Sequence, residues 1–257
     1  RESMSIAMRI AAVSAPLVLA AAGLAAPFTA GNLVVSRIGD GTTTYTGGVA
    51  APMFLDEFTT AGISTLNSIA LPTSASGANF TITGSLTLTS MGFLTRSTDG
   101  QFLTIAGFDA PLSTTGPSGN SGFRGRTIAV INANGVVDTT TRFEASGTTP
   151  RSVASTDGNT LWTAFDTGSG TTGGVRSLSR GSLTSGTLVT DATGATNTRV
   201  VNIFNNRLYV SASTATGTGG AISFRGVNVI GTGLPTTTGN PMSAVIGGGA
   251  GNAGPLD

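Results

Sequence analysis

The chemistry open to this chain is limited first by the residue types that it lacks. The sequence contains no cysteine and no histidine, and all 13 of its basic residues are arginine. Disulfides, zinc thiolate sites and the Ser-His-Asp and Cys-His systems are therefore excluded, and without lysine so is Schiff-base chemistry. Carboxylates, arginines, tyrosines, amides and hydroxyls remain for catalysis or binding.

Asp56 and Glu57 are the only adjacent carboxylates in the sequence. Such a pair could act as a general acid and base or as calcium ligands. Neighbouring residues of a strand point to opposite faces, however, so the two side chains cannot easily serve one site. The alternative is a pair of solvated charges that discourage pairing at a sheet edge, and we favour it.

Two arginines and the single tryptophan complete the candidate ligand-binding residues. Arg124 and Arg126 fall in a stretch rich in Gly, Ser and Pro, 113–126, where they could hold an anionic ligand as forked donors or be solvated in a loop. Trp162 could be a platform for a carbohydrate, but its place in a predicted strand favours a core position. No catalytic residue and no metal ligand is assigned.

Short strands separated by Gly, Asp-Gly and Asn-Gly turns must position these residues. The apolar patterns predict strands over 32–38, 53–58, 63–71 and 127–131, and a hairpin at Asn134-Gly135 with both turn residues at positive φ. No helical period appears after residue 30. The composition agrees, because Thr, Ser, Val and Gly are abundant and charged residues are only 10%.

The strands recur as a repeat. A tight polar turn and a strand led by leucine occur at 97–106, at 155–164 and, more loosely, at 204–212. A further strand then begins at Ile128, Val175 and Ile222, at equal spacing. A repeat of this length with about four strands per unit is typical of β-propeller blades. We therefore predict an all-β fold, a β-propeller of four-stranded antiparallel blades, with units near 31–72, 82–142, 150–190 and 198–246.

The first 26 residues predict a secretory signal peptide. Arg9 precedes an apolar run that ends in Ala25-Ala26, which is shorter than a membrane span. Cleavage there leaves a propeller domain over 27–257, without a transmembrane segment, in the periplasm, outside the cell or on its surface. The Gly-rich tail closes no blade, so we favour part of a larger propeller over a small four-bladed one.

Several of these segments resemble a family of uncharacterised, secreted bacterial β-propeller proteins. The resemblance rests on 31–41 and 54–58 near the start, and on 199–205, 208–211 and 224–227 in the later units. It implies a propeller fold and export. It implies no activity, because the family has none to carry over.

We compare three functions. A non-catalytic binding or scaffold module fits the near-neutral charge and the missing catalytic residue types, with an unknown protein or carbohydrate as partner. A calcium-dependent propeller hydrolase or lactonase would need several convergent carboxylates, and only in that case is calcium, or any cofactor, expected. An adhesin-like β-solenoid would need a shorter and stricter repeat. No basic run suggests nucleic acid, and we expect a monomer.

Overall fold

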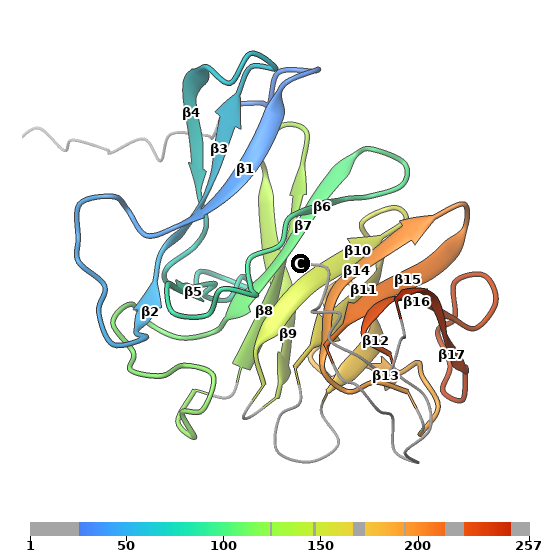
Figure 1. Ribbon diagram of the computed structural model, residues 1–257. Coiled ribbons are helices and arrows are strands. Elements are labelled where there is room, and N and C mark those ends of the chain that lie inside the picture. Colours follow the sequence, from blue (N-terminus) through green and yellow to red (C-terminus); the bar gives the residue numbers. More distant parts are fainter. Residues whose placement is uncertain are drawn as a thin grey trace, which may run out of the picture.

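The computed structural model describes residues 26–123, 125–145, 148–166, 173–192, 194–213 and 224–247. Within these residues every regular element is a strand, as the sequence predicts (Figure 1). Nearly all of the predicted signal peptide, and Arg124, lie outside the described residues.

The strands form four antiparallel sheets that follow one another in chain order. Sheet 1 contains β1 (Leu33–Ile38), β3 (Met53–Phe58) and β4 (Ser64–Ala70). Sheet 2 contains β6 (Thr95–Arg96), β7 (Phe102–Phe108), β8 (Gly125–Asn132) and β9 (Val137–Glu144). Sheet 3 contains β10 (Pro150–Ser155), β11 (Thr160–Phe165), β12 (Gly174–Ser179) and β13 (Thr187–Leu188). Sheet 4 contains β14 (Thr198–Phe204), β15 (Arg207–Ala212), β16 (Gly226–Ile230) and β17 (Met242–Gly247).

Each sheet is a meander whose strands pair in sequence order. The four sheets fall within the four predicted units, although the first has three strands rather than four. A short extra pair joins β2 (Ala50–Ala51), between β1 and β3 in the chain, to β5 (Gly84–Ser85), between sheets 1 and 2. Residues 222 and 223 of the predicted strand at 222–225 lie outside the described residues, and the third strand of sheet 4 begins at Gly226.

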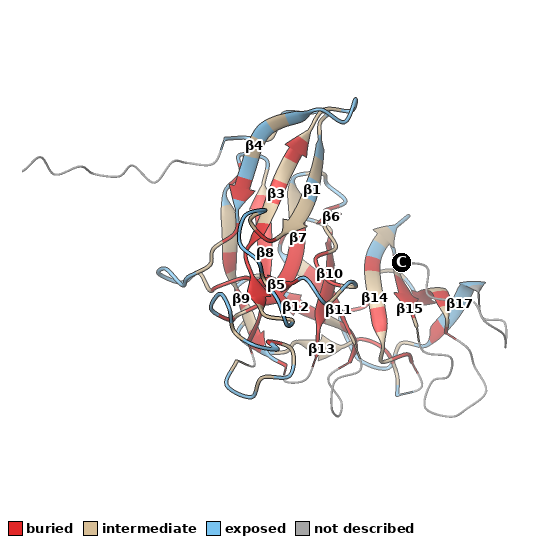
Figure 2. Ribbon diagram, turned by 60° about the vertical axis from the view of Figure 1, so that its left-hand side comes forward, coloured by how far each residue is buried: buried red, intermediate tan, exposed pale blue. Residues whose placement is uncertain are grey.

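Three hydrophobic clusters fill the spaces between consecutive sheets. The cluster between sheets 1 and 2 includes Leu55 and Ile105, and the cluster between sheets 2 and 3 includes Ala106 and Leu161. The cluster between sheets 3 and 4 includes Trp162. Adjacent residues of one strand thus enter opposite clusters, as the two-residue period of a strand requires. Sheets 2 and 3 are consequently buried on both faces (Figure 2).

The outer edges of β10 and β14 are hydrogen-bonded to the preceding sheet. In β10, the carbonyl oxygen of Val153 accepts the hydroxyl of Thr104 at 2.7 Å and also that of Thr95. In β14, the carbonyl oxygen of Arg199 accepts the hydroxyl of Ser152 at 2.8 Å. Side-chain hydroxyls therefore join one sheet to the first strand of the next.

The turns of the repeat form as predicted in two of the sheets. Asp99 Oδ1 accepts the backbone N–H of Gln101 at 3.0 Å, and Asp157 Oδ1 accepts that of Asn159 at 2.9 Å. The prediction for Asn134-Gly135 is half wrong. Within that turn only Gly135 has positive φ, and Asn132 Oδ1 accepts two backbone N–H groups to close a longer loop.

Candidate functional site

Asp56 and Glu57 point to opposite faces of sheet 1, as their adjacency in β3 predicts. Asp56 lies on the outer face and forms a two-pronged ion pair with Arg37 on β1, with N–O distances of 2.6 and 3.1 Å. The bond from Arg37 lowers the pKa of Asp56, and a bond from Ser68 adds to the effect. Asp56 is thus engaged in a cross-strand pair on the partly exposed face.

Glu57 does not match the prediction of a solvated edge charge, because its side chain is buried. Its Oε1 accepts the backbone N–H of Thr29 at 2.6 Å and the amide of Asn32 at 2.9 Å, while its Oε2 accepts the amide of Asn67 at 2.9 Å. Burial raises the pKa of Glu57, but these hydrogen bonds outweigh it and lower the pKa to about 2. Glu57 therefore fastens the segment before β1 to sheet 1.

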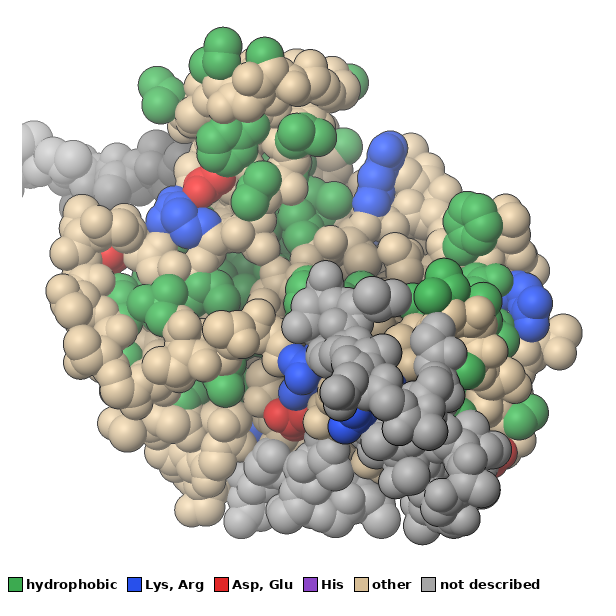
Figure 3. Space-filling model, in the orientation of Figure 1, with side chains coloured by type: hydrophobic (Ala, Val, Ile, Leu, Met, Phe, Trp, Pro, Cys, Tyr) green, Lys and Arg blue, Asp and Glu red, His purple; other side chains and the backbone are tan. Residues whose placement is uncertain are grey.

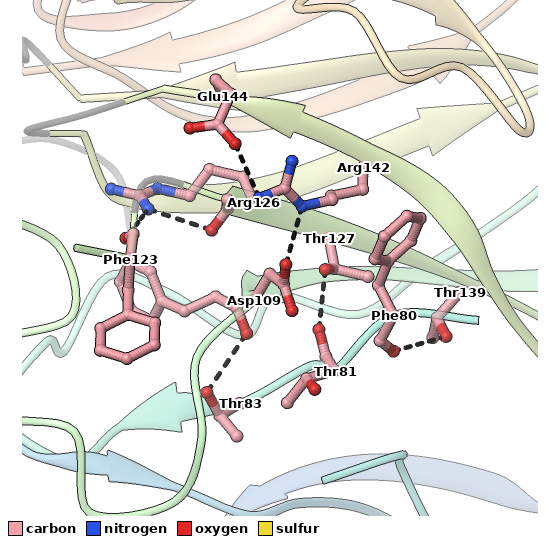
Figure 4. Close-up of polar contacts among 12 residues, drawn as sticks. Phe80, Thr81, Thr83, Asp109, Phe123, Arg126, Thr127, Thr139, Arg142 and Glu144 are labelled. Atoms are coloured by element: carbon pink, nitrogen blue, oxygen red, sulfur yellow. Dashed lines mark hydrogen bonds and ion pairs between the residues drawn. The ribbon is translucent and has the colours of Figure 1, made fainter. Parts of the chain in front are cut away.

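Arg126 is not a solvated loop residue, which corrects the sequence prediction. It lies on β8, and its side chain is among the largest that are fully buried. Its Nε donates to the carbonyl of Thr148 at 2.9 Å, and its Nη2 donates to the carbonyl of Ser118 at 2.9 Å. Nη1 donates to the carbonyls of Phe123 and Gly125 (Figure 4). The sequence could not show this, because the preceding loop folds its own carbonyls over the guanidinium and Thr148 adds another from beyond β9.

The carboxylates near Arg126 are bound to Arg142, the neighbouring arginine (Figure 4). Arg142 contacts Asp109 and Glu144, each at 2.7 Å. Burial therefore lowers the pKa of Arg126 to about 10, although Asp166 and Glu144 at longer range oppose it. Since its guanidinium is enclosed and bound to carbonyls, Arg126 holds the 113–123 segment on sheet 2 and does not present a charge to a ligand.

Trp162 is a core residue, which confirms the reading that the sequence favoured. Its side chain is 2% exposed, and its indole N–H donates to the carbonyl of Pro235 at 2.7 Å. A carbohydrate platform needs an open ring face, so Trp162 is removed from the candidate ligand-binding residues.

The best candidate site is a pocket of about 410 Å³ that the sequence did not reveal. Its walls come from the segment 28–34, from the first turn of sheet 2 at 96–103, and from 131–133 at the end of β8. A volume of this size falls within the usual range for small-ligand sites. Because the three segments are far apart in sequence, no local motif could have marked the pocket.

The pocket combines apolar walls with polar groups that are already held in place. Phe28 and Leu103, which also pack against the cluster between sheets 1 and 2, contribute apolar surface. Among the polar lining residues, Asn32 is bonded to Glu57, Arg96 donates twice to the carbonyl of Gly100, and Asn132 accepts backbone N–H groups of its own turn. Such a lining is suited to binding an uncharged or weakly acidic polar ligand without a large ordering cost.

Within the described part of the chain, no group of three or more acidic residues is placed to hold a metal ion. In the same residues no helix has the length and apolar character needed to cross a bilayer. Comparisons with protein-family models, with curated proteins and with solved structures found no match to this chain.

Proposed function

We propose that this chain is an exported, non-catalytic binding module built from β-propeller blades, and that its ligand occupies the pocket between the start of sheet 1 and the first turn of sheet 2. The observation that carries the proposal is the pocket itself. It has fixed amide and guanidinium groups beside the aromatic ring of Phe28, and no carboxylate lines it.

The succession of meander sheets supports the propeller. Successive blades of a propeller pack face to face and join end to start along the chain, and sheets 1 to 4 do the same. The apolar leader and the resemblance to secreted bacterial β-propeller proteins support export. Neither the leader nor the resemblance bears on the ligand.

A carbohydrate segment fits the lining best. The ring of Phe28 can cover the apolar face of a sugar, while the amides of Gln101 and Asn132 offer donors and acceptors to its hydroxyls. Arg96 at the rim can pair with an acidic sugar or add hydrogen bonds to a neutral one.

A glycan array probed with the full chain tests the proposal, with an array of short peptides as the comparison. We expect retention of a glycan that weakens at least about tenfold for Gln101→Ala and for Arg96→Ala, since each removes a polar contact in the pocket. Arg207→Ala, a change of an exposed arginine in the corresponding turn of sheet 4, is the matched control. Binding that is equal in all four proteins, or confined to peptides, would contradict the carbohydrate assignment.

A further inference from the structure

The two end sheets of the succession each have one uncovered face. Sheets 2 and 3 pack against a neighbour on both faces, whereas sheets 1 and 4 do so on one. No hydrophobic cluster of the described residues joins sheet 1 to sheet 4. Among the described residues, the succession of sheets is therefore open at both ends.

The uncovered face of sheet 1 carries exposed apolar side chains around the ion pair between Arg37 and Asp56. Leu33 and Val35 on β1 are 52% and 49% exposed, and they pair across the strands with Phe58 and Asp56 of β3. The guanidinium of Arg37 lies 4.2 Å from the centre of the Phe54 ring on the same face. In Figure 3 hydrophobic side chains gather over sheet 1, at the top of the view.

The uncovered face of sheet 4 carries exposed apolar side chains as well. In β15 the alternate residues Leu208 and Val210 enter the cluster with sheet 3, so Tyr209 between them points away from it. Phe204 at the end of β14 is 67% exposed, and Ile246 on β17 is 59% exposed. Residues of this kind are normally covered when they lie together on a sheet face.

These two faces are the two halves of a contact that the chain already makes three times. We call the face of a sheet that packs on the preceding sheet its leading face, and the face that packs on the following sheet its trailing face. In each internal contact, the trailing face of one sheet packs against the leading face of the next. Sheet 1 offers an unused leading face, and sheet 4 offers an unused trailing face. A contact between them would continue the established packing with the same kind of surface.

From this continuity we infer that a second copy of the chain covers these faces, with sheet 4 of each copy packed on sheet 1 of the other. Two such contacts around a twofold axis join the copies head to tail and close the succession into a ring, which leaves no apolar end face open. This replaces the monomer that the sequence suggested. The pocket lining includes Leu33, the first residue of β1, but neither Val35 nor any residue of sheet 4.

The test is the mass of the full chain in solution, measured by light scattering or sedimentation over a range of concentrations. We expect a dimer for the wild type. Val35→Asp on sheet 1 and Ile246→Asp on sheet 4 should each give a monomer, because either change places a charge in both contacts of the ring. Leu183→Asp, at an exposed residue between β12 and β13, is the matched control and should stay dimeric.

Mixing the two variants separates this arrangement from other dimers. The trailing face of the Val35→Asp chain and the leading face of the Ile246→Asp chain are both intact, so the mixture should regain a dimer while each variant alone does not. A contact between two identical faces would not be rescued in this way. Trp162 emission and circular dichroism confirm that each variant is folded. A monomeric wild type, or variants that remain dimeric, would overturn the inference.

Discussion

Arg126 places a guanidinium in the interior with only backbone carbonyls as its hydrogen-bond acceptors. Arg126→Met removes all the donors and leaves the carbonyls of Thr148 and Ser118 without them. We expect the free energy of unfolding to fall by about 3 kcal/mol, the usual cost of leaving buried polar groups unpaired. Urea denaturation measures this.

Arg126→Lys keeps the positive charge of the side chain but changes the geometry of its hydrogen-bond donors. An ammonium is a compact donor that cannot span acceptors arranged around a planar guanidinium, so we expect the lysine variant to lose nearly as much stability as the methionine variant. Exposed Arg207→Met is the control and should change stability by less than about 0.5 kcal/mol. A loss at Arg126→Met as small as this control would show that the carbonyls find other donors.

Glu57 makes stability depend on pH in the acid range. Its pKa is about 2 in the folded chain against an ordinary value of 4.5, so the folded state favours the carboxylate. The stabilisation is complete above the ordinary value and is lost as the pH falls from there toward the folded value. Between about pH 5 and about pH 2.5 the wild type should therefore lose more stability than Glu57→Gln, which has no proton to bind.

Denaturation curves across this pH range measure the difference between the two proteins. Asp56→Asn is a useful comparison, because its pKa is also lowered but it lies on the partly exposed face. If Glu57→Gln follows the wild-type curve in parallel, Glu57 is not the group that titrates.

At the scale of the element, the turn between β14 and β15 depends on backbone conformation. Asn205 and Asn206 both have positive φ, at 46° and 55°, a region that branched side chains rarely adopt. Asn206→Val should lower the free energy of unfolding by about 1–2 kcal/mol. Asn134→Val is the matched control, because Asn134 itself does not have positive φ and should tolerate the change. Thermal denaturation measures the stability of the two variants, and only Asn206→Val should unfold at a clearly lower temperature than the wild type.

The elements were largely predictable from sequence, and the site was not. Strand periodicity and the Asp-Gly turns at Asp99 and Asp157 depend on neighbours in the chain, so the sequence indicated three of the four sheets closely. Glu57 has partners in a distant segment, and Arg126 is enclosed by the fold of its own loop together with the distant Thr148. The loop-like composition around Arg126 therefore predicted a solvent-exposed side chain, although the chain folds backbone carbonyls over it. The pocket depends on three distant segments in the same way.

At the scale of the whole molecule, the clusters connect neighbouring sheets only. Leu55→Ala weakens the cluster between sheets 1 and 2, at a typical cost of about 2–5 kcal/mol, but touches none of the residues around Trp162. In a chain of nearest-neighbour contacts such a change should unfold sheet 1 at a lower denaturant concentration than sheets 3 and 4.

The single tryptophan reports on sheets 3 and 4 alone, so its fluorescence can be compared with circular dichroism of the whole chain. We expect the two transitions of Leu55→Ala to separate, with dichroism changing first. Leu208→Ala, in the cluster that contains Trp162, is the matched control and should shift the fluorescence transition directly. Coincident transitions in both variants would show that the four sheets unfold as one cooperative unit.

The hydroxyl groups that bind the edges of β10 and β14 also limit the addition of a foreign strand at these edges. Its composition, rich in threonine and valine with no lysine, lacks the charges that commonly guard an exposed strand. Here the carbonyls of Val153 and Arg199 already hold donors from the preceding sheet, so a foreign strand would first have to displace them. Replacing Thr104 or Ser152 with a residue that cannot donate a hydrogen bond would then weaken this protection at the edge concerned. The net charge of the chain would not change.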